Sequence, residues 1–239
     1  MLFLFVLASI AGGVASVTGF GIGSILTPFV ALSVGTPLAV AAVSIPHLVG
    51  TAVRYAALWR HTSWPVLLRF GLASAAGGLA GALLQPAFGA RGLTLLLGAL
   101  LVVTAVASLT GVLERREWPP GVAVTLGGVS GAFGGLVGNQ GGVRSGALLA
   151  FHLEPLAFIA TATATGLIVD AARMPVYLIR SGEALVGVAH DIGVMTAGVV
   201  FGTILGQRVL RRLPRELFRK LVGAAVGVVG AWLIVSALR

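Results

Sequence analysis

The chain has 239 residues, of which 57% are hydrophobic and only 10% are charged. A soluble domain carries roughly 25% charged residues, and the seven acidic and sixteen basic side chains of this sequence cannot cover a soluble protein of this size. This composition excludes a disordered chain and a soluble nucleic-acid-binding module, and the absence of cysteine excludes a disulfide scaffold. The sequence therefore predicts an all-α integral membrane protein whose surroundings are lipid.

Apolar stretches follow one another along the whole chain with short connections. A helix needs about 20 apolar residues to cross a hydrocarbon core of ~30 Å. The first and the fifth stretches are too long for one crossing, and each has a glycine cluster near its middle. Both are therefore predicted to be discontinuous helices or re-entrant hairpins. The eight stretches run over residues 2–34, 37–58, 65–87, 92–113, 119–152, 155–179, 184–207 and 217–237.

Basic residues distinguish between two topologies. If all eight stretches cross, twelve of the sixteen basic residues divide five against seven, and neither side is clearly cytoplasmic. If the first and fifth stretches are hairpins, nine of these basic residues lie on one side of the membrane and three on the other, which satisfies the positive-inside rule. The Arg208–Lys220 loop is then cytoplasmic and both termini lie outside. The nine are Arg60, Arg115, Arg116, Arg208, Arg211, Arg212, Arg215, Arg219 and Lys220, and the three are Arg91, Arg180 and Arg239.

The two halves of the chain have the same order of landmarks. Each has a glycine cluster, then a Pro-Leu-Ala segment (Pro37–Ala39 and Pro155–Ala157), then a helix with a polar stripe. Three crossings per half invert the second half relative to the first. The sequence thus predicts two inverted membrane repeats of about four segments each, residues 1–113 and 119–239, joined by a loop over 114–118.

Each polar stripe has residues at spacings of three and four, which place them on one face of a helix. Buried arginines on such stripes suggest a cavity that accepts an anion. Two alternatives remain: Arg54 and Arg173 extend to an interface, or Asp170 and Arg173 neutralise each other. His47 and Asp170 are the candidates for binding or relaying a coupling proton. The stripes are Ser44, His47, Thr51 and Arg54, and Thr163, Gly166, Asp170 and Arg173.

Arg144 lies just beyond the second glycine cluster. A half-helix that begins after a break directs free N–H groups and a positive dipole end toward a ligand. The Arg144 guanidinium adds a planar fork suited to oxyanions. No metal-ligand spacing occurs, so neither a metal nor a cofactor is predicted. The predicted substrate-binding residues are Gly19, Gly21, Gly23, Ser24, Ser44, Arg54, Gly138, Asn139, Gln140, Gly141, Gly142, Arg144, Thr163 and Arg173.

Over essentially its whole length the sequence resembles the sulfite exporter TauE/SafE family, also called TSUP transporters. The resemblance rests on the duplicated glycine break and Pro-x-Ala entry (Gly19–Pro28 with Thr36–Ala39, and Gly138–Gly142 with Glu154–Ala157) and on the small-residue segment Gly77–Gly81. It implies a prokaryotic inner-membrane carrier for sulfite, organosulfonates or related anions, coupled to an ion gradient. The chain departs from the usual run of three glycines at Ser24 and at Asn139-Gln140.

The sequence therefore predicts a secondary transporter of a small sulfur oxyanion that works by alternating access. An intramembrane lipid-pyrophosphate phosphatase is an alternative, but it needs a convergent acid–base or nucleophile set. Asp170 is the only acidic residue in the polar stripes. A passive anion channel or an exporter subunit is a third hypothesis, which flux against an imposed pH gradient separates from a carrier.

Overall fold

The computed structural model describes residues 1–19, 21–112, 118–209 and 215–239. Within these ranges all regular elements are helical and no strand occurs, which confirms the all-α class. Most of the predicted loop at 114–118, and residues 210–214 of the Arg208–Lys220 loop, lie outside the described residues. The helices are α1 (Leu2–Thr18), α2 (Ile22–Val34), α3 (Thr36–Leu58), η1 (Trp59–His61), α4 (Trp64–Val66), η2 (Leu67–Gly71), α5 (Leu72–Leu84), η3 (Gln85–Phe88), α6 (Gly89–Thr110), α7 (Pro120–Val137), α8 (Gly141–Leu148), η4 (Leu149–Phe151), α9 (Pro155–Gly187), α10 (Ala189–Val209) and α11 (Arg215–Leu238).

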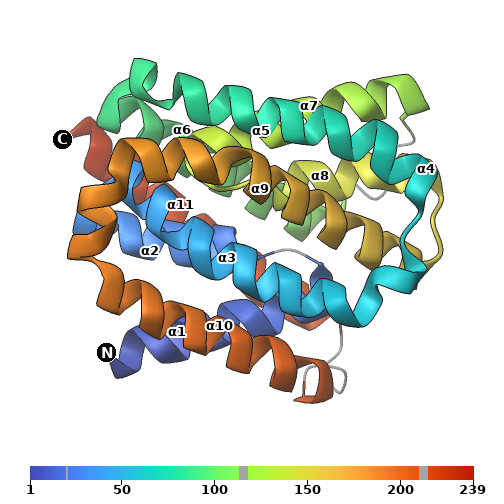
Figure 1. The fold of residues 1–239 in the computed structure, drawn as a ribbon, viewed down its shortest axis with the longest axis horizontal. Helices are drawn as coiled ribbons and strands as arrows, with labels where there is room; N and C mark the ends of the chain where they lie inside the picture. Colours follow the sequence, from blue (N-terminus) through green and yellow to red (C-terminus); the bar gives the residue numbers. More distant parts are fainter. Residues whose placement is uncertain (20, 113–117, 210–214) are drawn as a thin grey trace.

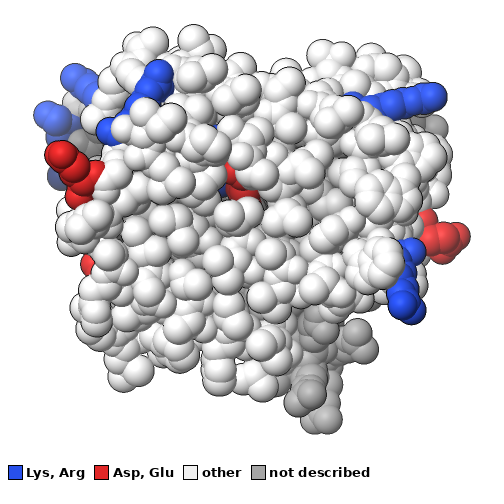
Figure 2. Space-filling view, in the orientation of Figure 1, with Lys and Arg blue, Asp and Glu red and all other residues white. Residues whose placement is uncertain are grey.

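Several helices are long and apolar enough to cross a membrane. In the described part of the chain five qualify, and the one at Trp64–Thr110 has 47 residues, more than one crossing needs. Figure 2 shows that most charged side chains on one face gather at its two ends, with few charged atoms in the band between them. The chain is therefore an integral membrane protein. The other four spans are Thr36–His61, Pro120–Val137, Pro155–Gly187 and Ala189–Gly206.

Long helix pairs build the molecule, and small residues let their backbones touch. Helix α1 packs along α10, α5 along α7 and α6 along α11. A Cβ atom on Gly131 of α7 would overlap the Ser74 carbonyl of α5, and one on Gly202 of α10 would overlap the Ser9 carbonyl of α1. Such close approach is what small residues permit in membrane helices.

Helices α3 and α9, which carry the polar stripes, pack against each other in the middle of the molecule (Figure 1). Each also contacts one of the outer pairs, α3 through α10 and α9 through α5. The buried Arg54, His47, Asp170 and Arg173 side chains of the two stripes therefore lie in the interior of the molecule.

Candidate functional site

The first glycine cluster separates α1 from α2. Helix α1 ends at Thr18, and Gly19 follows in the left-handed conformation (φ 81°), with its N–H donating to the Ala15 carbonyl over 3.0 Å. Gly21 has a φ of 129°, and α2 begins at Ile22. L-residues with a side chain rarely adopt these φ values, so the glycines allow the chain to change direction here.

The second glycine cluster repeats this geometry. Helix α7 ends at Val137, Gly138 is left-handed (φ 71°), and its N–H donates to the Gly134 carbonyl over 3.0 Å. Helix α8 begins at Gly141. Gly19 and Gly138 are 119 residues apart, as are their acceptors Ala15 and Gly134. We call each interruption with its flanking residues a break: break one is residues 15–25 and break two is residues 134–144.

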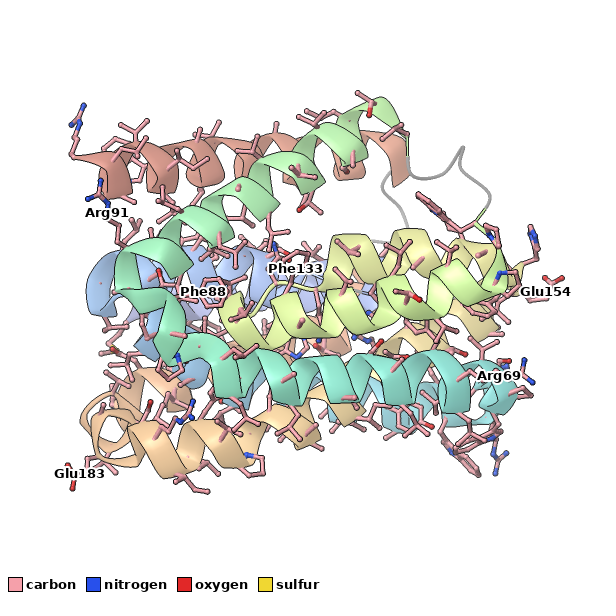
Figure 3. All side chains as sticks on the ribbon, turned by 90° about the horizontal axis from the view of Figure 1, so that it is seen from above. Arg69, Phe88, Arg91, Phe133, Glu154 and Glu183 are labelled. Carbon is pink, nitrogen blue, oxygen red and sulfur yellow. The ribbon has the colours of Figure 1, made fainter. Side chains whose placement is uncertain are left out.

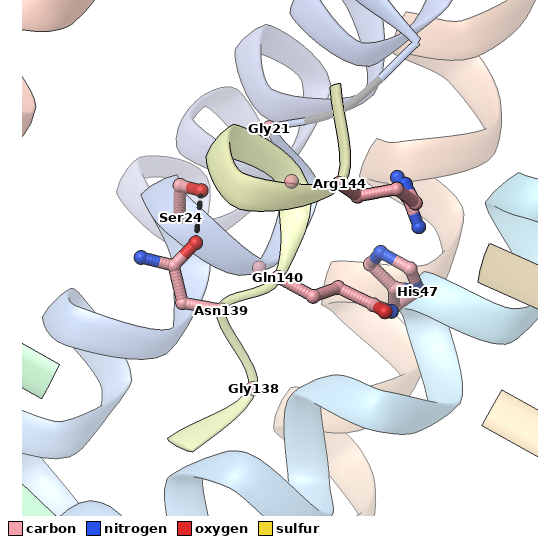
Figure 4. A pocket seen from close by; sticks show the side chains of 9 residues that line it. Gly21, Ser24, His47, Gly138, Asn139, Gln140 and Arg144 are labelled. Atoms are coloured by element: carbon pink, nitrogen blue, oxygen red, sulfur yellow. Dashed lines mark hydrogen bonds between the residues drawn. The ribbon is translucent and has the colours of Figure 1, made fainter. Parts of the chain in front are cut away.

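The two breaks lie against each other. Ser24 donates a hydrogen bond to Oδ1 of Asn139 over 2.8 Å, and a Cβ atom on Gly23 would overlap the carbonyl oxygen of Gly138. Between them lies a polar cavity (Figure 4) with about 200 Å³ of empty space, including the part that opens outward. Because this figure includes open space, the enclosed part is smaller still and has room for a small solute only. The cavity is lined by Gly21, Gly23, Ser24, His47, Gly138, Asn139, Gln140, Gly141 and Arg144.

Two helix N-termini begin at this cavity. The first intrahelical hydrogen bond of α2 runs from Ile25 N to the Gly21 carbonyl, and that of α8 runs from Arg144 N to the Gln140 carbonyl. The N–H groups before these two residues have no acceptor within their own helix. Both helices therefore present N–H donors and the positive end of a dipole to the cavity, which favours an anion there.

Arg144 is 1% exposed, and only one of its guanidinium nitrogens donates a hydrogen bond to the protein. Its Nη2 donates to the Gly19 carbonyl over 3.3 Å, whereas Nε and Nη1 have no hydrogen-bond partner. The side-chain amide of Gln140, 4% exposed, also has no partner at either terminal atom. In Figure 4 the Arg144 and Gln140 side chains both extend toward His47. Buried polar atoms without a protein partner are unusual, and water or a bound solute can satisfy them.

Gly166 provides the space that the Arg144 guanidinium occupies. A Cβ atom on Gly166 would lie 2.8 Å from Nη1 of Arg144. We expect Gly166→Ala to displace the guanidinium and to weaken anion binding about tenfold, the equivalent of one charged hydrogen bond. Anion binding to purified Gly166→Ala and Gly182→Ala proteins checks this, because a Cβ on Gly182 meets nothing within 4 Å. Equal affinities in the two variants would contradict it.

Arg54 is buried against the end of α1 and does not line the cavity. It is 2% exposed, and its Nη1 and Nη2 donate to the carbonyls of Ala15 (2.7 Å) and Gly19 (3.4 Å). Its Nε donates to Oγ1 of Thr163 on α9 over 3.0 Å. Arg54 thus joins break one to the opposite half of the molecule.

Arg173 belongs to a buried ion network that starts at the cavity wall. His47 Nδ1 lies 2.5 Å from Oδ2 of Asp170, and Oδ1 of Asp170 accepts hydrogen bonds from Arg173 Nη2 (2.8 Å) and Nε (3.1 Å). The remaining terminal nitrogen, Nη1, donates to the carbonyl of Gly134. Asp170 therefore links the wall residue His47 to the end of α7.

The structure thus separates the predicted binding residues into two groups. Eight of them line the cavity together with His47. Gly19 lies at its edge, where its carbonyl accepts hydrogen bonds from Arg54 and Arg144. The others lie elsewhere: Ser44 donates to the Ala41 carbonyl (2.6 Å), Gly142 packs on Thr104, and Thr163, Arg54 and Arg173 have the partners given above.

Three side chains that the sequence interpretation missed also hold break two. Tyr177 donates to the Gly135 carbonyl, Gln85 to the Leu136 carbonyl (3.0 Å) and Ser130 to the Gln140 carbonyl (2.9 Å). Tyr177 continues the polar stripe of α9 four residues after Arg173, a signal that was present in the spacing. No pattern marks Gln85 or Ser130.

A helical membrane fold with a buried polar cavity between interrupted helices is typical of membrane transport proteins. The family model for the sulfite exporter TauE/SafE matches residues 4–233, and the chain belongs to this family. The match confirms the resemblance seen in the sequence and makes the chain a member of a family of membrane sulfite and anion exporters. No curated protein and no solved structure matches the chain.

Proposed function

We propose that this protein is a secondary transporter that binds a small sulfur oxyanion, such as sulfite, in the cavity between the two breaks. The observation that carries the proposal is the pair of unpartnered, buried Arg144 nitrogens in a cavity where two helices begin. A planar guanidinium and converging N–H groups replace the hydration shell of an oxyanion well.

The balance of buried charge also supports an anionic substrate. Three arginines, Arg54, Arg144 and Arg173, are each at most 2% exposed, and Asp170 is the only acidic side chain among the buried polar residues of the described chain. Asp170 neutralises Arg173 through two hydrogen bonds. Uncompensated positive charge is costly in a membrane interior, so an anion in the cavity stabilises the protein.

Inverted repeats over 1–113 and 119–239 are part of the proposal. In this comparison α1 corresponds to α7, α3 to α9 and α5 to α10. Each of the following helix contacts then has a counterpart under the same correspondence, which supports the repeats. Helix α1 packs on α10 and α7 packs on α5, while α3 packs on α10 and α9 packs on α5. Two breaks that lie face to face at the centre fit rocking of one half against the other about a fixed site.

We further propose that α1–α2 and α7–α8 are re-entrant hairpins, so that the end carrying Arg60 is cytoplasmic and both termini are external. Arg69 and Glu154 lie at one end of the molecule, and Arg91 and Glu183 lie at the other (Figure 3). Single cysteines at Leu2 and at Arg60, both exposed, should therefore react with an impermeant maleimide from opposite sides of the membrane. Labelling of both from the same side would contradict the hairpins.

His47 and Asp170 are the proposed site of coupling to a proton. His47 lines the cavity and contacts Asp170, so a proton gained or lost at this pair changes the charge next to the anion.

Uptake into liposomes of sulfite, thiosulfate, sulfonates, sulfate and carboxylates, with and without a pH gradient, tests the proposed function. We expect sulfite or a sulfonate to accumulate against its gradient when a pH gradient is imposed. Passive equilibration alone would indicate a channel, and no flux of any of these anions would reject the proposed function.

A further inference from the structure

Arg54 and Arg173 contact matched positions in the two breaks. Arg54 donates to the carbonyl of Ala15, and Arg173 donates to that of Gly134. In each half the same carbonyl also accepts the N–H of the left-handed glycine that ends the helix. The two arginines, the two carbonyls and the two glycines are all separated by 119 residues, so the contact is repeated in the two halves.

Both contacts meet a physical requirement of the interrupted helix. The carbonyls of Ala15 and Gly134 lie in the last turn of their helices, at the negative end of the dipole, and each keeps a second lone pair that the glycine N–H does not use. In the interior of a membrane protein no bulk water is present to satisfy them. A guanidinium supplies several donors and a positive charge at once.

We propose that Arg54 and Arg173 are positioning residues that clamp the ends of α1 and α7, and thereby fix where α2 and α8 begin at the cavity. This rests on the proposed function, because the cavity is taken as the anion site. Only a few residues separate each clamped helix end from the next helix start. A shift of either end is therefore transmitted to the N–H groups that face the anion. Arg144 remains as the arginine that contacts the anion.

The carbonyl of Gly19 connects the clamp to the cavity. It accepts hydrogen bonds from both Arg54 and Arg144, so the clamp on break one also anchors the cavity arginine of break two. On the other side, Asp170 holds Arg173 and contacts the cavity residue His47. Each clamp therefore has one physical link to the cavity without lining it.

Cysteine reporters in this cysteine-free chain test the clamps without requiring transport. Ser24→Cys reports on break one and Asn139→Cys on break two, read as the rate of reaction with neutral N-ethylmaleimide. We expect Arg54→Gln to raise the rate at residue 24 about tenfold, because a break without its clamp opens more often, and Arg54→Lys to restore part of the protection. Arg173→Lys, which keeps a cation beside Asp170, should raise the rate at residue 139.

Arg180→Gln is the matched control. Arg180 also donates to carbonyls near a helix end, those of Ala82 (3.1 Å) and Leu83 (3.0 Å) in α5. Helix α5, however, does not lead into either break. The rates at residues 24 and 139 should stay within about twofold in this variant. Unchanged rates in the Arg54 and Arg173 variants, or an equal rise in Arg180→Gln, would overturn the clamps.

Uptake kinetics add the second readout. Arg54→Gln should lower the maximal uptake rate about tenfold or more while KM rises less than it does in Arg144→Gln, because Arg54 acts on the anion only through the breaks. A rise in KM equal to that of Arg144→Gln, with an unchanged maximal rate, would mean direct contact and would overturn the proposal. If the wild type carries none of the anions, the proposed function fails, and the labelling rates still decide whether the clamps exist.

Discussion

Replacing Arg144 by Gln should weaken binding of the transported anion at least about 100-fold. Hydrogen bonds between charged partners contribute about 1.5–3 kcal/mol each, and two of the guanidinium nitrogens, Nε and Nη1, are free to bond an oxyanion. Arg144→Lys should retain the charge but lose the planar fork, and about tenfold weaker binding is expected.

The Arg144 variants are best compared with Arg91→Gln. Arg91 lies at one end of the molecule (Figure 3) and is exposed. Uptake and equilibrium binding should be measured for all four proteins in the same liposomes and detergent. Arg144→Lys with wild-type affinity, or Arg91→Gln as weak as Arg144→Gln, would remove Arg144 from the binding site.

Gly23→Ala should abolish transport although alanine is a better helix former than glycine. The new Cβ atom would overlap the Gly138 carbonyl, which is backbone and cannot rotate away. The two breaks must then move apart, and overpacking of this kind destabilises a protein by about 1–3 kcal/mol. We expect folded protein in the membrane, a lower unfolding temperature and uptake at background level.

Two further glycines provide the comparison. A Cβ on Gly142 would meet the methyl group of Thr104, a side-chain end that can change rotamer, so Gly142→Ala should be milder than Gly23→Ala. A Cβ on Gly121 meets nothing within 4 Å, so Gly121→Ala should transport normally. If Gly23→Ala transports as well as Gly121→Ala does, the contact between the breaks has no role in transport.

Local composition and spacing were enough to predict the helical membrane class, because lipid requires long apolar helices. The glycine clusters were also visible in the sequence. The structure gives the reason for them, because φ values such as 81° at Gly19 and 71° at Gly138 favour glycine. The spacing of the stripes placed Arg54 and Arg173 on the inner faces of their helices. Their partners, however, are carbonyls on other helices, and helix periodicity alone does not identify those.

The space beside Arg144 could not be predicted from the sequence either. Gly166 appeared as a gap in a polar stripe, and its role depends on the guanidinium of Arg144 lying next to it in space. Contacts between residues far apart in the chain, such as Ser24 with Asn139 or Gln85 with Leu136, follow from the packing of whole helices. A single sequence gives no signal for such contacts.

Binding of radiolabelled sulfite to the purified protein tests most directly whether the cavity between the breaks holds an anion through Arg144. Wild-type protein, Arg144→Gln and Arg180→Gln should be titrated under the same conditions, with folding checked by the unfolding temperature. We expect saturable binding to the wild type and to Arg180→Gln, and binding at least about 100-fold weaker to folded Arg144→Gln. Sulfite binding that is equally tight in Arg144→Gln would contradict this assignment of the site.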